Sequence, residues 1–302
     1  MIEPSNVEQS NMKDTYQDWS ERAIKELKGK PLESLFWNNS SGLNFKPYYS
    51  AEESVRRFPA NVLRNSAEWD VYETIEVKDA KTANRAALEA LNAGASALCF
   101  SISSAVNLDI AVLLDQIGLP YIQCGFVLPL EEQESFAQAL RQWIDQSGFE
   151  AGACQGYLQD AAQKRSDGQD LAMAYQKNLA LTKQLQTLLP GFRCLVLDAC
   201  LWANQGMTAE MELALVLSAW HEALEAGFTG KVQVNLGTGR EFYTELIKFR
   251  VLPHLLSTLA EAYTIPFNTE SIYLKAESSE IYLSDLDSYT NLLRLSTAGM
   301  SA

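Results

Sequence analysis

An alternation that begins near residue 70 most constrains the fold. From there to residue 302, short apolar runs alternate with longer amphipathic segments. Strands are predicted at residues 70–77, 97–103, 121–128, 151–155, 193–199, 231–236 and 271–277. Helices are predicted at residues 80–93, 108–117, 131–146, 170–188, 209–226, 240–259 and 287–302. Strict alternation forms a parallel sheet with helices outside it. Repeats averaging roughly 30 residues therefore predict an α/β fold, a (β/α)8 TIM barrel.

The barrel predicted in this way lacks its eighth strand–helix unit, because the pattern provides only seven units. An open barrel would expose the edges of its first and last strands. We therefore expect the sequence to be a fragment of a longer natural protein, with residues 67–302 forming a truncated barrel domain.

Two predicted strands carry small or polar residues at every second position. Bulky residues such as Phe100, Ile102, Val232 and Val234 would face the outer helices. The interior would then be lined by Cys99, Ser101, Ser103, Gln233 and Asn235. Because the interior of most barrels is filled by Val, Ile and Leu, this lining favours a channel for an elongated polar ligand. Local variation within a packed barrel is the alternative.

Residues 1–66 differ from the rest and form an N-terminal arm with a linker. Residues 14–29 predict a helix closed by Gly29, and an aromatic-rich segment follows it. The arm either folds back on its own domain or packs on another chain, since interface cores favour Trp, Tyr and Phe. The candidate interface residues are Trp19, Leu27, Phe36, Trp37, Tyr48 and Tyr49.

Charge and cysteine usage exclude several classes of protein. The formal net charge of -14 opposes binding to nucleic acid or to anionic membranes. The polar N-terminus does not resemble a signal peptide, and no apolar stretch reaches the roughly 18 residues of a spanning helix. The five cysteines form no CxxC pair, so we expect buried reduced thiols in a cytoplasmic protein and no metal site.

Few residues offer catalytic chemistry. His221 and His254 both lie in predicted helices, away from the strand ends where barrel enzymes place catalytic groups. Asp198 and Glu277 lie at the ends of predicted strands and are candidate acids, bases or ligand contacts. A structural hydrogen bond to a neighbouring loop is the alternative for Asp198. Residues 237–239 (GTG) precede a helix and would bind an anion there or form a plain turn.

Several segments resemble methylmalonyl-CoA mutases, in the order of that family, and among them residues 79–94 look like the family's first barrel helix. Residues 26–35 (ELKGKPLESL) and 42–49 (GLNFKPYY) are similar to the family's N-terminal arm. Residues 239–250 (GREFYTELIKFR) and 287–294 (DSYTNLLR) are similar to two of its barrel helices. The resemblance covers about residue 19 to the end, and it implies a CoA-threading barrel. In the family, adenosylcobalamin supports the isomerisation of methylmalonyl-CoA and succinyl-CoA in propionate metabolism.

Three active-site segments of the family are altered here. Cys200 and Leu201 replace the Tyr-His pair of catalytic chains, so no catalytic residue is expected. Residues 276–280 (AESSE) replace S-Q-T-S-G, and residues 155–157 (QGY) replace Q-N-D. The resemblance therefore implies the small, non-catalytic subunit of a heterodimeric isomerase, inactive without a large catalytic partner and binding no cofactor itself. A divergent active mutase and a stand-alone CoA-ester binding barrel remain alternatives.

If a CoA ester still enters the interior, six residues are candidates to contact it. Each is polar and lies in or beside a predicted strand or at the start of a predicted helix. They are Ser101, Ser103, Gln155, Asp198, Asn235 and Arg240.

Overall fold

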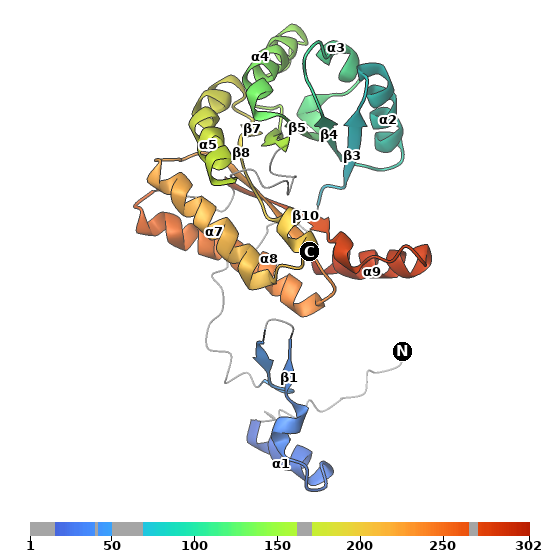
Figure 1. The fold of residues 1–302 in the computed structure, drawn as a ribbon, viewed down its shortest axis with the longest axis vertical. Helices are drawn as coiled ribbons and strands as arrows, with labels where there is room; N and C mark the ends of the chain where they lie inside the picture. The colour runs from blue at the N-terminus through green and yellow to red at the C-terminus, as the bar shows by residue number, and fades with distance from the viewer. Residues whose placement is uncertain (1–15, 40–41, 50–68, 162–170, 266–270) are drawn as a thin grey trace, which may run out of the picture. The chain divides into compact units, whose positions relative to one another are not determined.

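The computed structural model describes residues 16–39, 42–49, 69–161, 171–265 and 271–302. The chain divides into two compact units, Met1–Pro59 and Ala60–Ala302, which we call the arm and the α/β unit. The predicted boundary between residues 66 and 67 lies outside the described residues. Figure 1 traces the elements of both units.

The arm contains a helix, a short 3-10 turn and a small hairpin. Helix α1 (Tyr16–Glu26) is followed by Gly29, whose φ of 93° is the left-handed conformation that glycine adopts without strain. The turn η1 (Leu32–Leu35) leads into strands β1 (Trp37–Asn38) and β2 (Asn44–Phe45), which pair antiparallel. The arm helix predicted from residue 14 is thus observed from Tyr16, the first described residue.

Strands and helices alternate along the α/β unit, as the sequence predicts (Figure 1). Its strands are β3 (Tyr72–Val77), β4 (Ala97–Ile102), β5 (Gln123–Leu128), β6 (Gly156–Asp160), β7 (Phe192–Arg193), β8 (Leu195–Asp198), β9 (Val232–Thr238) and β10 (Ile272–Ser278). Its helices are α2 (Ala80–Asn92), α3 (Ile110–Leu113), α4 (Leu130–Gln146), α5 (Leu171–Leu188), α6 (Cys200–Asn204), α7 (Ala209–Glu225), α8 (Phe242–Ala262) and α9 (Ser288–Ser301). Two further 3-10 turns are η3 (Leu119–Tyr121) and η6 (Glu280–Tyr282).

The ladders found among the described residues of the α/β unit are all parallel and join strands in chain order. One sheet has the order β3-β4-β5-β6-β7, and a second has the order β8-β9-β10. Strands β7 and β8 are separated only by Cys194, so the two sheets continue one another along the chain. The α/β prediction is confirmed. No ladder joins β3 to β10 among the described residues.

Each sheet packs its outer face on helices. Phe100 and Phe126 stack under α4 with ring centroids 5.7 Å apart, and both belong to a large core with Ile102. A second core joins Val232 and Val234 of β9 to residues of α7 and α8, including the fully buried Trp220. The prediction that the bulky strand residues face the helices is therefore confirmed.

The opposite, inner face of the strands carries a different set of side chains. A third cluster contains Cys99, Val127, Tyr157 and Val196, one from each of β4, β5, β6 and β8. The alternation in the sequence therefore separates an outer apolar face from an inner, more polar face. The five cysteines are buried, as predicted.

One predicted strand was wrong. Residues 151–155 were expected to form a strand, but 151–153 lie in a turn and the strand is β6, at Gly156–Asp160. The small residues of the turn are Ala151, Gly152 and Ala153. The strand instead uses a segment in which Gln159 and Asp160 are buried beside Tyr157 and Leu158, and Gln159 hydrogen-bonds to Asp198 of β8 and Asn235 of β9.

Other boundaries also differ from the prediction. The strand expected at residues 193–199 is interrupted at Cys194, and α3 covers only part of residues 108–117. Helix α8 begins at Phe242 and continues through Pro253 to Ala262, because buried Leu252 and Leu256 hold both of its halves on the sheet. The short helix α6 was not predicted. Within the part of the chain that the structure describes, no helix is both long and apolar enough to span a membrane.

Candidate functional site

Asp198 ends strand β8 and is the best-placed carboxylate at the carboxyl edge of the sheets. Its Oδ2 accepts hydrogen bonds from Gln159 Nε2 and from Asn235 Nδ2, the latter at 3.0 Å. Its Oδ1 accepts from the backbone N–H of Cys200 at 2.9 Å. Both oxygens are thus held by neighbouring groups, and the carboxylate fixes the first turn of α6.

Helix α6 carries the two residues that stand at the Tyr-His positions of the resemblance. Cys200 is buried and Leu201 is half-buried. The helix lies tightly on β9, because a Cβ placed on Gly237 would come within 2.3 Å of the Ala203 Cβ. Only glycine at position 237 allows this approach.

The segment after β10 is bound to α6. Asn204 Oδ1 accepts hydrogen bonds from Ser279 Oγ at 3.0 Å and from Glu280 N at 2.8 Å. Ser279 is buried. Two of the three altered segments, residues 198–206 and 276–280, therefore meet at the carboxyl edge and are tied together by structural hydrogen bonds.

The third altered segment lies at the other edge of the sheet. Gln155 directly precedes β6, and its Oε1 accepts from Gln123 Nε2 at 2.8 Å, at the start of β5. Because the strands are parallel, their starts and their ends lie at opposite edges. The structure therefore does not bring Gln155 together with Asp198.

The remaining candidates are dispersed at the carboxyl edge. Ser101 is half-buried in β4, and Ser103 is exposed just after that strand. Arg240 is exposed in the turn after β9, with its guanidinium 5.2 Å from the Tyr282 ring centroid. None of the hydrogen bonds found among the described residues joins these three side chains to Asp198. Only Asp198 and Asn235 of the six candidates share a hydrogen bond.

Most of the polar residues on the inner face of the sheets were not predicted from the sequence. Arg193 Nε donates to Gln233 Oε1 at 3.1 Å, and its Nη2 donates to Gln123 Oε1 at 2.8 Å. Lys275 Nζ donates to Tyr157 Oη at 3.2 Å. A signal was present in residues 273–277, where Tyr, Lys and Glu alternate with other residues along a strand and therefore share one face.

A buried ion cluster holds the end of β9. Lys248 Nζ lies 3.1 Å from Glu212 Oε1 and 2.6 Å from Glu245 Oε2, and it donates to the carbonyl of Gly237 at 2.6 Å. Glu212 Oε2 accepts from the Gly237 N–H at 3.2 Å. Gly237 and Thr238 are the last residues of β9, and the Gly237 N–H and carbonyl are already bonded within the chain, so residues 237–239 form a braced strand end. Burial raises the pKa of Glu212 to about 7, although Lys248 opposes this change.

The raised pKa of Glu212 predicts a pH-dependent stability. Its carboxyl pKa is 4.5 unfolded and about 7 folded, so the folded state binds the proton more tightly. The stabilisation is complete below pH 4.5 and is lost as the pH rises through 7, by on the order of 3 kcal/mol. Urea unfolding from pH 5 to 8 should show this loss in the wild type and a flatter profile in Glu212→Gln. If the free energy of unfolding changed with pH in the same way in both proteins, the prediction would be wrong.

The described residues at the carboxyl edge of the sheets include no histidine and no cluster of metal-binding side chains. No cluster of three or more metal-binding side chains occurs among the described residues. His221 and His254 lie in α7 and α8, as predicted, and His221 Nε2 is 2.8 Å from Tyr263 Oη. Cys200 and Leu201 offer neither the phenol nor the imidazole of the family's Tyr-His pair. The residues present here therefore do not fit a corrin cofactor.

Fold and site together define a parallel α/β protein whose strand-end segments are braced by structural hydrogen bonds. No family model matches the chain. It is 26% identical over 310 residues to the methylmalonyl-CoA mutase small subunit of Porphyromonas gingivalis, covering 94% of this chain and 50% of that relative. It is 22% identical over 336 residues to the mitochondrial methylmalonyl-CoA mutases of Bos taurus and Homo sapiens, covering 94% of this chain and 45% of each.

These alignments confirm the recognition made from the motifs. The chain is similar to methylmalonyl-CoA mutases, among them the small subunit of one of these enzymes. It spans about half the length of the curated relatives it matches.

Proposed function

We propose that this chain is the small, non-catalytic subunit of a cobalamin-dependent methylmalonyl-CoA mutase. In this role it supports the isomerisation of methylmalonyl-CoA and succinyl-CoA by a large catalytic partner. The observation that carries the proposal is the identity and burial of two residues in α6. The residues at the Tyr-His positions are a buried Cys200 and a Leu201, in a helix that is anchored at Asp198 and Asn204.

We extend the α/β assignment to an incomplete (β/α) barrel. The strands follow one another in order from β3 to β10. Tyr273 of β10 donates a hydrogen bond of 2.7 Å to Asp70, two residues before β3. This contact between the last strand and the start of the first supports a sheet that curls on itself.

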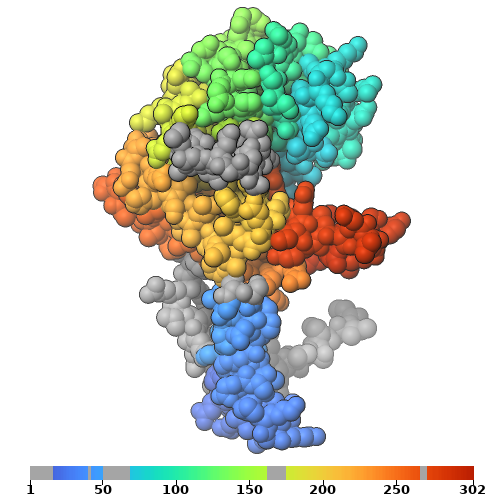
Figure 2. Space-filling view, in the orientation of Figure 1, coloured from blue at the N-terminus to red at the C-terminus, as the bar shows by residue number. Residues whose placement is uncertain are grey.

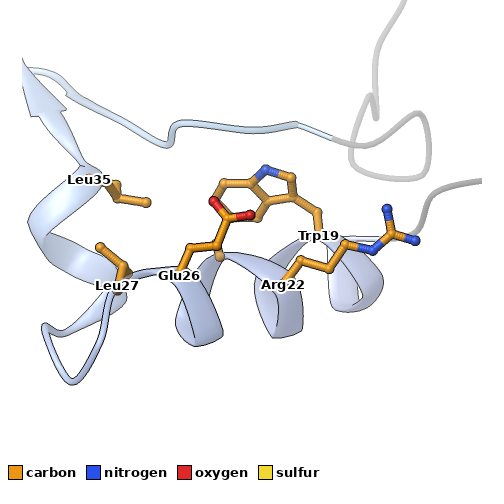
Figure 3. Close-up of a pocket in the computed structure, with 6 residues that line it drawn as sticks. Trp19, Arg22, Glu26, Leu27 and Leu35 are labelled. Atoms are coloured by element: carbon orange, nitrogen blue, oxygen red, sulfur yellow. The ribbon is translucent and has the colours of Figure 1, made fainter.

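The arm is proposed to bind the partner. Its apolar side chains are poorly covered within its own unit: Trp37 is 53% exposed and Tyr49 is 56% exposed. Trp19 stacks on Tyr48 with centroids 5.3 Å apart. Beside α1 lies a groove of about 510 Å³, lined by Trp19, Arg22, Ala23, Glu26, Leu27 and Leu35 (Figure 3). Exposed aromatic and aliphatic groups of this kind are typical of interface cores.

The C-terminal helix adds a second apolar surface. Helix α9 stands out from the rest of the α/β unit in Figure 2, in red. Tyr289, Leu292, Leu293 and Met300 are all exposed on it. Contiguous apolar surface of this kind marks an interaction site, so we assign this surface to the partner interface as well.

Adenosylcobalamin is assigned to the assembled enzyme and not to this chain, since the residues at its carboxyl edge do not fit the cofactor. Its chemistry there is the supply of a radical. The contribution of this chain is assembly and support.

The purified chain should not isomerise methylmalonyl-CoA when supplied with adenosylcobalamin. Leu201 has no group that donates a hydrogen bond or transfers a proton. Turnover is expected only after the large partner is added, and it should at least reach tenfold over a no-enzyme control. The assay follows succinyl-CoA by chromatography. Turnover by the chain alone would instead identify a divergent active mutase.

Deleting residues 1–49 should weaken binding to the large partner at least about tenfold, or ~1.4 kcal/mol. The deleted segment carries the exposed aromatic groups of the arm. Trp37→Ser should weaken binding in the same direction, whereas Tyr121→Ser, which changes an exposed tyrosine of the α/β unit, should not. Affinity is measured by titration of immobilised partner. Equal affinity of the deletion variant and the full chain would show that the arm is intramolecular.

A further inference from the structure

Lys275 projects from β10 to the inner face of the sheets, where its side chain is only 6% exposed. Its Nζ lies 2.6 Å from Glu277 Oε1 and donates to Tyr157 Oη at 3.2 Å. The same nitrogen lies 5.3 Å from the centroid of the Tyr72 ring and 5.6 Å from that of the Tyr157 ring. The ammonium group is therefore enclosed by two aromatic rings, a phenol oxygen and a carboxylate.

The Tyr157 ring beside Lys275 is itself fixed. A Cβ on Gly125 would come within 2.2 Å of the Tyr157 ring, so the ring lies directly over this glycine of β5. Tyr157 Oη donates to Cys99 Sγ at 3.1 Å. Burial raises the pKa of Tyr157 well above its usual value and that of Tyr72 to about 12. Both phenols therefore stay neutral, and Tyr157 accepts from Lys275 while donating to Cys99.

Further polar side chains fill the inner face on both sides of this cage. Toward the strand starts, the Arg193 guanidinium lies 4.0 Å from the Tyr273 ring centroid. In the β9–β10 ladder, Gln233 is level with Tyr273 and Asn235 is level with Lys275. Gln159 lies toward the strand ends, and these three side chains are fully buried and bonded to one another or to Asp198. Arg193, Gln159, Gln233 and Asn235 are all hydrogen-bonded within the chain, so these four side chains are not left unpaired for a bound molecule.

We infer that Tyr72, Tyr157 and Glu277 form an ammonium-binding cage whose resident ligand is the chain's own Lys275, and that this side chain closes the interior to a CoA ester. Aromatic rings attract a cation through the negative faces of their π-systems, and desolvation strengthens that attraction. The carboxylate adds a charge-assisted contact. The inference does not depend on the proposed role as a small subunit.

The cage is tested by removing its ligand. In Lys275→Ala, the lost atoms correspond to propylammonium. This cation should raise the Tm of the variant saturably, by about 2–6 °C. Propanol and sodium chloride at the same concentrations should not. The wild type and Lys81→Ala, which removes an exposed lysine of α2, should not respond to propylammonium. A folded Lys275→Ala that is insensitive to propylammonium would overturn the cage.

Two measurements on the wild-type chain test the same inference without relying on the folding of Lys275→Ala. Calorimetric titration with methylmalonyl-CoA at millimolar concentration should show no saturable binding. Amine labelling followed by mass spectrometry should modify Lys81 rapidly and leave Lys275 protected in the native chain. Saturable binding of the CoA ester, or labelling of Lys275 as fast as Lys81, would show that the interior is open. Neither outcome bears on whether a large partner is required for turnover.

Discussion

Replacing Lys248 by alanine is expected to lower the free energy of unfolding at pH 8 by about 3–5 kcal/mol, because it leaves buried carboxylates without their cation. The Lys248 side chain is fully buried between Glu212 and Glu245. The substitution also removes the donor that binds the Gly237 carbonyl. The measurement is urea unfolding followed by circular dichroism.

Two comparisons separate charge from packing in this cluster. Lys81→Ala, on the exposed face of α2, should change the free energy of unfolding by less than about 0.5 kcal/mol. Lys248→Met combined with Glu212→Gln and Glu245→Gln should recover much of the loss, since no buried charge then lacks a partner. The loss in Lys248→Ala should also be smaller at pH 5, where Glu212 is protonated. A variant as stable as the wild type at pH 8 would disprove a structural role for the ion cluster.

Gly156→Ala is expected to be the most damaging single methyl addition, costing about 3 kcal/mol or more. A Cβ at this position would lie 1.8 Å from the carbonyl oxygen of Cys124 and 2.7 Å from the Phe192 ring. The oxygen belongs to the backbone of the neighbouring strand, which cannot move aside without breaking the β5–β6 ladder.

The matched control for this substitution is Gly152→Ala, four residues earlier. Gly152 is exposed, and a Cβ added to it would meet nothing closer than 3.9 Å. Its effect should stay within about 0.5 kcal/mol. Thermal unfolding of both variants decides the matter, and a Gly156→Ala protein that melts with the wild type would refute the predicted clash.

Periodicity determined most of the architecture. The sequence alone predicted the alternation of strands and helices, because buried parallel strands and amphipathic helices have different hydrophobic periods. It also predicted which of the residues in β4 and β9 face the helices. It failed at β6, where the polar Gln159 is buried through hydrogen bonds to β8 and β9, which no hydrophobic pattern signals.

The candidate site could be predicted only in part. Asp198 was identified from its place at a strand end. Its carboxylate accepts a hydrogen bond from the backbone N–H of Cys200, which is the structural role given as the alternative to ligand contact. Gln155 was grouped with it because the strand predicted at residues 151–155 would end at Gln155, whereas the observed strand β6 begins at Gly156, directly after it. Lys275, Tyr157 and Arg193 were missed because their partners come from strands far apart in the sequence.

The sequence by itself determined the fold class, the family resemblance and the loss of the Tyr-His pair, because each of these depends on residue type and local order. Only the tertiary structure decided what fills the inner face of the sheets. Tyr72, Tyr157 and Lys275 come from β3, β6 and β10, and the contact between them exists only once the strands are assembled. The physical reason is that a buried cation is stabilised by groups close in space, and the distance between those groups along the chain carries no information about their distance in the fold.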